Sequence, residues 1–302
     1  MGIRLVYGLD TDDLSYLGEF YPSRRLAQAA DALGLDYAAT IHQRNGNPED
    51  ATRFCRGHVA LLRGELPAEL YESLEAAGVF VVNSAAATAL ARDKAASADF
   101  FNCIGSAHPR TTRVDRSRPE PPLPFPFVFK PRFGKMGKGI CLVDTAVLWS
   151  ECLLGNPSVD YIAQEYVEAS RGRDVRFFFA DFDHAGGSSG GWNVAPVSVL
   201  RHGPALASNA HAGGVMEKFD APAPLRTEAV RIFAASGLAY GTVDFLFADE
   251  SGKAFTVCEI NSCPGFEEFE RVTRLDAAGA ILSSALASAV KREPCPPRRE
   301  PA

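Results

Sequence analysis

The most restrictive feature of the sequence is the segment GTVDFLFADESGKAFTVCEINSCPGF, residues 241–266. Two runs of apolar and β-branched residues flank a short polar stretch, which is typical of two antiparallel strands joined by a turn. If Ser251 and Gly252 form a two-residue turn, Glu250 faces Lys253, and pairing continues outward along both strands. The segment therefore predicts a β-hairpin with a defined register.

This register brings three oxygen-bearing side chains together. Asp244 lies opposite Glu259, with Cβ atoms roughly 5 Å apart, and Asn261 shares their face because side chains alternate along a strand. Facing carboxylates repel each other, and Mg²⁺ relieves that repulsion. We therefore interpret the three residues as a metal site, so that removing either acid need not destabilise the metal-free protein and Glu259→Gln could even stabilise it. The alternative is a solvated strand end whose acids avoid each other or pair with arginine. Cys258 is expected to point to the opposite face.

A second informative segment is PFVFKPRFGKMGKGICLV, residues 126–143. A predicted strand ends at Lys130, three glycines follow, and another strand begins at Ile140. Glycine lets backbone amides approach an anion closely, and the lysines of the loop add positive charge. No Gly-Lys-Ser/Thr is present and a strand follows the loop, which argues against a Walker loop and a Rossmann turn. The segment alone fits either a phosphate-binding loop or an ordinary hairpin with a glycine-rich tip.

The N-terminal part of the chain alternates predicted strands with helices, which favours a small parallel α/β unit. The strands are expected at Ile3–Gly8, Tyr37–Ile41, His58–Leu62 and Val79–Val82, and the helices at Ser23–Leu33 and Pro67–Ala77. The next segment, Ser84–Ala98, has the composition of one helix.

The pattern changes after the proline-dense segment Ser117–Pro126, which predicts a loop because proline breaks both helix and sheet. Beyond it, strands come mostly in adjacent pairs, as in antiparallel units. The expected pairs are Phe127–Lys130 with Ile140–Val143, Arg173–Asp181 with Asn193–Arg201, and Thr242–Ala248 with Ala254–Asn261. The segment His184–Trp192 resembles a flexible hairpin tip.

Composition narrows the classes of partner. The formal net charge is -6 and no long basic run exists, which argues against a nucleic-acid partner. No stretch approaches the roughly 20 apolar residues of a membrane helix, and no secretion signal is visible. The seven cysteines are scattered without a CxxC pair, so neither a zinc site nor a disulfide framework is expected. A cytoplasmic protein is the simplest interpretation.

The order of these motifs resembles that of the ATP-grasp enzymes, in particular the RimK-like glutamate ligases. The resemblance covers residues 63–282. It implies an ATP-grasp fold of mixed α/β (α+β) class behind an N-terminal parallel α/β domain, with ATP and Mg²⁺ as cofactors and Mn²⁺ as an alternative ion. The segments that carry it are NSAAATALARDK, FKPRFGKMGKG, AQEYVEASRGRDVRFFF, LRHGPALASNAHAGG and NSCPGFEEFE.

Within these segments the resemblance implies individual roles. Lys130 and Arg201 would serve catalysis by neutralising phosphate charge. The metal ligands would be Asp244, Glu259 and Asn261. The lid departs from the family pattern at Lys135-Met136, where small or amide residues are common. Nucleotide-binding residues would be Lys94, Lys130, Gly137, Gly139, Gln164, Glu165, Tyr166, Val167, Asp174, Arg201 and Asn209.

The implied activity is a ligation. The γ-phosphate of ATP passes to a carboxylate, and an amine attacks the acyl phosphate. The partners would be an amino acid, glutamate at the level of the family, and a carboxylate acceptor such as a peptide, a protein tail or a cofactor. Two alternatives stay open, a phosphotransferase on the same fold and a nucleotide-binding regulator without chemistry. A homo-oligomer also stays open.

The resemblance also suggests an organisation. Residues 1–85 would form an N-terminal α/β domain that holds part of the substrate. Residues 86–162 would carry the phosphate lid, and residues 163–292 the hinge and the metal site. Residues 293–302 are expected to be a disordered tail, because they are proline-rich.

Three arginines are weaker candidates for substrate binding. Arg176 shares the strand face of Asp174, so it either pairs with a neighbouring acid or binds a substrate carboxylate through its planar fork. Arg63 follows a predicted strand and could serve the same purpose, as could Arg274.

Overall fold

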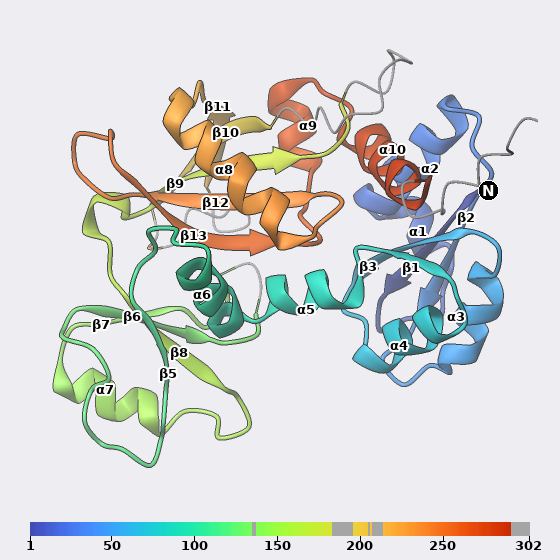
Figure 1. Cartoon of the computed structure of the whole chain (residues 1–302). Helices are drawn as coiled ribbons and strands as arrows, with labels where there is room; N and C mark the ends of the chain where they lie inside the picture. Colours follow the sequence, from blue (N-terminus) through green and yellow to red (C-terminus); the bar gives the residue numbers. More distant parts are fainter. Residues whose placement is uncertain (135–136, 183–195, 205, 207–213, 291–302) are drawn as a thin grey trace, which may run out of the picture. The chain divides into compact units, whose positions relative to one another are not determined.

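The structure is a computed structural model of the whole chain (Figure 1). It describes residues 1–134, 137–182, 196–204, 206 and 214–290, and the statements below concern these residues. They fall into two compact units. The first unit contains residues 1–85, 180–182 and 276–290, and the second contains the remainder. The three-part division expected from the sequence stays a prediction.

Four parallel strands form the sheet of the first unit, in the order β2-β1-β3-β4. The parallel α/β unit expected from the alternating pattern is confirmed. The central strands β1 and β3 are apolar and largely buried, as strands of parallel sheets usually are. The elements are β1 (Ile3–Gly8), α1 (Tyr16–Glu19), α2 (Tyr21–Ala32), β2 (Tyr37–His42), α3 (Pro48–Cys55), β3 (Val59–Gly64), α4 (Ala68–Ala76), β4 (Phe80–Val82) and α10 (Ala277–Val290).

Helix α10 joins the first unit although it comes last in the described chain. Most of its residues are apolar and buried. The hydroxyl of Ser284 accepts a hydrogen bond from the backbone N–H of Asp181 at 2.8 Å, which ties residues 180–182 to the helix. Among the described residues, no helix combines the length and the apolar character needed to cross a membrane.

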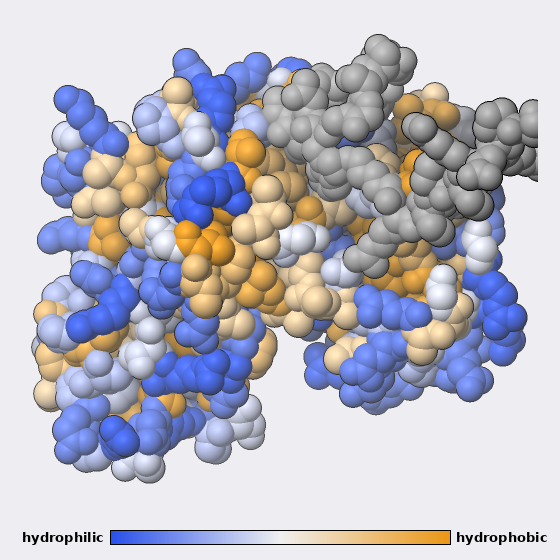
Figure 2. All heavy atoms as spheres, viewed as in Figure 1, coloured by the Kyte–Doolittle hydropathy of each residue, from blue (hydrophilic) through white to orange (hydrophobic). Residues whose placement is uncertain are grey.

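The second unit contains two antiparallel sheets. The smaller one has the order β5-β8-β6-β7, and its pairing of β6 with β7 confirms the first predicted strand pair. Phe127 and Phe129 of β6 pack edge-on against Trp149 of helix α7. In Figure 2, hydrophilic residues cover much of this region, at the lower left. The elements are β5 (Thr111–Arg113), β6 (Phe127–Pro131), β7 (Cys141–Val143), α7 (Ala146–Leu153) and β8 (Tyr161–Glu165).

The larger sheet has the order β11-β10-β9-β12-β13 and confirms the other two predicted strand pairs. Phe179 of β9 stacks on Phe233 of α8, whereas its neighbour Phe178 stacks on Phe269 of α9. Because neighbouring residues point to opposite faces, the two helices cover opposite faces of the sheet. The elements are η1 (Glu168–Ser170), β9 (Arg173–Phe179), β10 (Val197–His202), β11 (Val215–Lys218), α8 (Ala223–Ser236), β12 (Gly241–Phe247), β13 (Phe255–Asn261) and α9 (Glu267–Thr273).

The expectation of one helix over Ser84–Ala98 is wrong. The segment forms α5 (Ala85–Arg92) and α6 (Lys94–Cys103), which are separated by Asp93 in an extended conformation. The Asp93 carboxylate accepts hydrogen bonds from the first N–H groups of α6 and from the Arg132 guanidinium, at 2.8 Å to its nitrogen Nε. This capping and the ion pair favour a new helix start at Asp93.

The end of helix α9 offers a stability test. Arg274 adopts a left-handed conformation there, with φ of 64°, which costs a residue other than glycine roughly 1–2 kcal/mol. We expect Arg274→Gly to raise the free energy of unfolding by about 0.5–1 kcal/mol, because glycine's greater freedom in the unfolded chain offsets part of the gain. Urea denaturation measures the change. The control Arg271→Gly, inside the same helix, should lower stability instead. A lower stability of Arg274→Gly would contradict this account.

Candidate functional site

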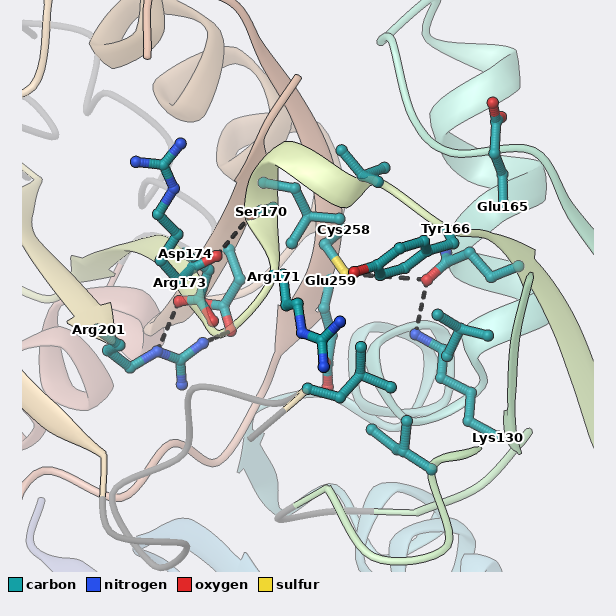
Figure 3. A pocket seen from close by; sticks show the side chains of 17 residues that line it. Lys130, Glu165, Tyr166, Ser170, Arg171, Arg173, Asp174, Arg201, Cys258 and Glu259 are labelled. Atoms are coloured by element: carbon teal, nitrogen blue, oxygen red, sulfur yellow. Dashed lines mark hydrogen bonds and ion pairs between the residues drawn. The ribbon is translucent and has the colours of Figure 1, made fainter. Parts of the chain in front are cut away.

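A pocket in the second unit is lined by residues of both sheets (Figure 3). It encloses about 800 Å³, part of which is open to solvent. The wall from the smaller sheet contains the apolar Val128 and Ile140 beside Lys130, Gln164 and Glu165. The hinge, residues 166–172 between β8 and β9, adds both apolar and polar side chains, and the larger sheet contributes most of the charges. The lining residues are Val128, Lys130, Ile140, Gln164, Glu165, Tyr166, Val167, Ser170, Arg171, Arg173, Asp174, Arg201, Leu206, Asp244, Leu246, Cys258 and Glu259.

Lys130 is held in place within the pocket. Its side chain stands at the end of β6, and the residue is only 5% exposed. Its ammonium donates a hydrogen bond to Oε1 of Gln164 at 2.8 Å. The amide nitrogen of Gln164 donates to the hydroxyl of Thr111 at 2.9 Å, which turns Oε1 toward the lysine. Lys130 therefore presents a fixed positive charge to any ligand of the pocket.

Lys94 brings a second ammonium group to the same region. It donates a hydrogen bond to the carbonyl oxygen of Gly134 at 2.7 Å, at the start of the glycine loop. Burial lowers the pKa of Lys94, Glu259 opposes this effect, and Lys130 adds to it. Gly137 and Gly139 both have positive φ, a conformation that favours glycine. The two lysines and the base of the loop thus gather near Glu259.

The larger sheet presents a row of opposite charges on one face. In register, Arg201 pairs with Asp174, Arg176 pairs with Asp244, and Asp244 pairs with Glu259. Arg201 donates to Asp174 at 2.7 Å and to Asp244 at 2.8 Å. Arg176 donates to both oxygens of Asp244, at 2.9 and 2.6 Å. Of the two roles considered for Arg176, the structure therefore contains the ion pair with a neighbouring acid.

These ion pairs set the charge state of the buried groups. Burial opposes ionisation of Asp244, but Arg176 and Arg201 outweigh burial and hold the pKa of Asp244 below its usual value. Burial likewise disfavours the charge of Arg201, yet Asp244 and Asp174 raise the pKa of its guanidinium. Asp244 is therefore a carboxylate and Arg201 a cation at neutral pH.

The predicted pairing of Asp244 with Glu259 is present, although the turn differs from the expected one. The strands stop pairing at Phe247 and Phe255, and Phe245 faces Val257. The two-residue turn was therefore wrong, and a bulge at Cys258 restores the register before Asp244. The same bulge turns Cys258 into the pocket, so its expected orientation away from Glu259 was wrong as well.

The donor set suits a divalent cation in its chemistry. Asp244 and Glu259 face each other, and the amide nitrogen of Asn261 donates a hydrogen bond to Oδ2 of Asp244 at 3.5 Å, which places Asn261 beside this acid. A few carboxylate and amide oxygens, completed by phosphate oxygens, are what Mg²⁺ accepts. Within the described ranges, no three His, Cys, Asp or Glu side chains are grouped closely enough to hold a metal ion by themselves.

The hinge, residues 166–172 after β8, contains a polar atom that could form a hydrogen bond with a ligand. The hydroxyl of Tyr166 is buried and has no hydrogen-bond partner within the described part of the chain. In Figure 3 the Tyr166 ring lies along the pocket, whereas the Glu165 side chain points away from it. That carboxylate accepts a hydrogen bond from the Arg110 N–H at 3.2 Å. The Glu165 carboxylate is therefore directed away from the pocket.

The other predicted residues lie elsewhere. Arg63 is buried in strand β3 of the first unit. Arg274 ends helix α9 and is not among the residues that line the pocket. Asn209, like the segment His184–Trp192 and the tail, lies outside the described residues.

Sequence reasoning missed Arg171. This exposed residue follows the short helix η1, and Figure 3 shows its guanidinium projecting into the pocket. The hinge segment contains it, three residues before Asp174. An irregular turn has no periodic pattern, so only its position within the hinge segment could have singled it out.

The fold and the pocket define an ATP-grasp protein. A family model described as the RimK-like ATP-grasp domain matches residues 90–285, and the chain belongs to this family of ATP-grasp ligases. Both the family resemblance and the fold class expected from the sequence are confirmed.

Individual relatives are moderately similar. The chain is 28% identical over 285 residues to a protein of Rhodopirellula baltica named a probable alpha-L-glutamate ligase, covering 87% of this chain and 67% of the relative. It is also 28% identical over 294 residues to probable alpha-L-glutamate ligase 2 of Shewanella amazonensis, covering 89% and 92%.

Solved structures share the fold. A D-alanine–D-alanine ligase from Bacillus anthracis matches with a TM-score of 0.68 at 15% identity, over 97% of this chain and 99% of the other. A RimK domain ATP-grasp protein from Sphaerobacter thermophilus matches with a TM-score of 0.65 at 20% identity, over 94% and 99%. At these identities the likeness concerns the fold alone.

Proposed function

We propose that this protein is an ATP- and magnesium-dependent ligase that joins a carboxylate to an amine through an acyl phosphate. The observation that carries the proposal is the pocket itself. An anchored lysine, Lys130, stands on one wall, and the charged row with Arg201, Asp244 and Glu259 stands on the other. Membership of a family of ATP-grasp ligases supports this choice.

The nucleotide would lie along the pocket with its base against the apolar side chains of the lining. Val128, Ile140 and Leu246 would pack on the base, and the hydroxyl of Tyr166 would gain the partner that it lacks among the described residues. Backbone groups of Glu165, Tyr166 and Val167 would form hydrogen bonds with the edge of the base. Lys94, Lys130 and Arg171 would face the phosphates, with Gly137 and Gly139 leaving room for close backbone approach.

The reaction would then depend on charge and position. Lys130 and Arg201 would neutralise the negative charge that develops as the γ-phosphate moves to the carboxylate. Asp244, Glu259 and Asn261 would hold Mg²⁺, which acts as a Lewis acid on phosphoryl oxygens. Fixed placement of both reactants supplies the rest of the rate enhancement.

Nucleotide binding has a direct test. Magnesium-ATP should raise the melting temperature, because a ligand that binds only the native state stabilises it by about 2.7 kcal/mol at a hundredfold excess over Kd. Differential scanning fluorimetry with ATP, ADP and GTP measures the shift. Absence of any shift at millimolar ATP, together with no heat in calorimetry, would contradict the proposal.

The relatives indicate only the chemical class of the substrates. Two of the relatives are named probable alpha-L-glutamate ligases, which supports glutamate as the amine. The carboxylate acceptor, a peptide, protein tail or cofactor, is implied by the family resemblance alone. A screen of carboxylate and amino-acid pairs for ADP formation, with the product weighed by mass spectrometry, separates ligation from phosphorylation. A product heavier by an amino-acid residue supports a ligase, whereas one heavier by a phosphoryl group indicates a kinase.

A further inference from the structure

The proposed metal site carries more positive than negative charge. Among the described residues, three carboxylates lie at the site, those of Asp174, Asp244 and Glu259. Lys94, Lys130, Arg176 and Arg201 lie around them, and the Arg171 guanidinium also projects into the pocket. Such a balance attracts anions and repels free divalent cations.

The geometry of Asp244 leads to the same conclusion. A carboxylate accepts roughly four hydrogen bonds, two at each oxygen. Oδ2 of Asp244 already accepts from Arg176 at 2.6 Å and from Arg201 at 2.8 Å. Oδ1 accepts from Arg176 at 2.9 Å. The Asn261 amide nitrogen also donates to Oδ2, at 3.5 Å. Only Oδ1 keeps an acceptor position, and a cation that approaches it is repelled by two neighbouring guanidinium groups.

Arg176 holds Asp244 from outside the pocket. Arg201 and Asp244 line the pocket, but Arg176 does not. The Arg176 side chain is 15% exposed and that of Asp244 is 5% exposed. A ligand can therefore draw Arg201 toward its phosphates and leave the Arg176 fork on Asp244 in place.

We infer that Arg176 and Arg201 are built-in counter-ions that prevent free divalent cations from binding, so that the metal enters only together with a nucleotide. The inference rests on the proposed function. Polyphosphate supplies the negative charge that the site lacks, and it offers Arg201 an alternative partner. Arg176 is thus a positioning residue. It orients Asp244 and weakens the electrostatic attraction between the Asp244 carboxylate and a metal ion.

The test measures binding of free Mn²⁺ to the nucleotide-free protein by electron paramagnetic resonance. Wild-type protein should bind Mn²⁺ at least tenfold more weakly without ADP than with it. Arg176→Met should bind free Mn²⁺ at least tenfold more tightly than wild type. Arg176→Gln, which keeps a hydrogen-bond donor toward Asp244 but no charge, should do the same and guards against misfolding of the first variant. Tight binding of free Mn²⁺ to wild type, or unchanged binding in both variants, would overturn the inference.

A matched control removes a guanidinium that forms no ion pair with these acids. Arg226 pairs with the exposed Asp220 at 3.1 Å, so Arg226→Met changes the net charge equally and should bind Mn²⁺ as wild type does. Calorimetric titration of the same samples with ADP separates two kinds of failure. Loss of ADP binding in wild type would count against the proposed function. Normal ADP binding with tight free Mn²⁺ would count only against the role of the arginines.

Discussion

Asp244→Asn should abolish ATP turnover and also destabilise the nucleotide-free protein. Asp244 is 4% exposed, and its carboxylate forms ion pairs with both Arg176 and Arg201. Breaking a buried ion pair leaves an uncompensated charge and costs about 3–5 kcal/mol. The sequence alone suggested that removing either acid need not destabilise the metal-free protein, and the arginines change that expectation for Asp244.

Glu259→Gln should abolish turnover without this loss of stability. Glu259 forms no ion pair within 4 Å among the described residues, so its removal weakens only longer attractions to Lys94 and Arg201 and relieves repulsion from Asp244. We expect its free energy of unfolding to stay within about 1 kcal/mol of wild type. Urea denaturation without metal, and ADP formation across a magnesium titration, test both variants. Wild-type turnover in both would rule out the metal site, and an unchanged stability of Asp244→Asn would contradict the ion-pair cluster.

Lys130→Met should lower kcat/KM for ATP by roughly 10- to 100-fold, because a charge-assisted contact to phosphate contributes about 1.5–3 kcal/mol. Its ammonium has one protein partner among the described residues, Oε1 of Gln164. Apo stability should change little, since the variant removes a buried charge while keeping the side-chain volume.

The control for Lys130 lies in the same segment. Lys138 is exposed and is not among the residues that line the pocket, so Lys138→Met should retain nearly wild-type kinetics. Steady-state rates with varied ATP distinguish the two lysines. Equal losses in both variants would show that the effect is general electrostatics, not a contact made by Lys130.

The hairpin at residues 241–266 shows how much of the structure the local sequence pattern predicts. The placement of Asp244 opposite Glu259 came from the assumed two-residue turn, and it holds because the bulge offsets the error in that turn. Alternation of apolar and polar residues was enough only to predict both strands. It did not predict the bulge, because a period of two has no place for an extra residue. In the structure Val257 and Ile260 are both buried although they are three residues apart, because the extra residue of the bulge puts them on the same face.

The contacts of Arg176 and Arg201 with Asp244 could not be predicted from the local sequence pattern, because they depend on the order of the strands in the sheet. Arg176 and Arg201 precede Asp244 by 68 and 43 residues. They meet it because β9 lies between β10 and β12. Pairing of adjacent strands was predictable from sequence, but the contact between β9 and β12 joins strands that are not neighbours in the chain.

The break at Asp93 has a similar cause. The run Ser84–Ala98 is rich in alanine, so helix propensity favours a single helix. The chain instead restarts at Lys94, because the Asp93 carboxylate caps the second helix and binds Arg132, which is 39 residues further along. Tertiary contacts override local propensity at this point and bring Lys94 to the glycine loop.

The most direct measurement of the central claim follows oxygen-18 from the acceptor carboxylate. Once the screen has found a substrate pair, the acceptor is labelled in its carboxylate and turned over with ATP and the amine. Transfer through an acyl phosphate predicts ADP and inorganic phosphate that carries one labelled oxygen, because the bond to the acyl carbon breaks when the amine attacks. Unlabelled phosphate, or label found in AMP, would contradict the proposed ligase.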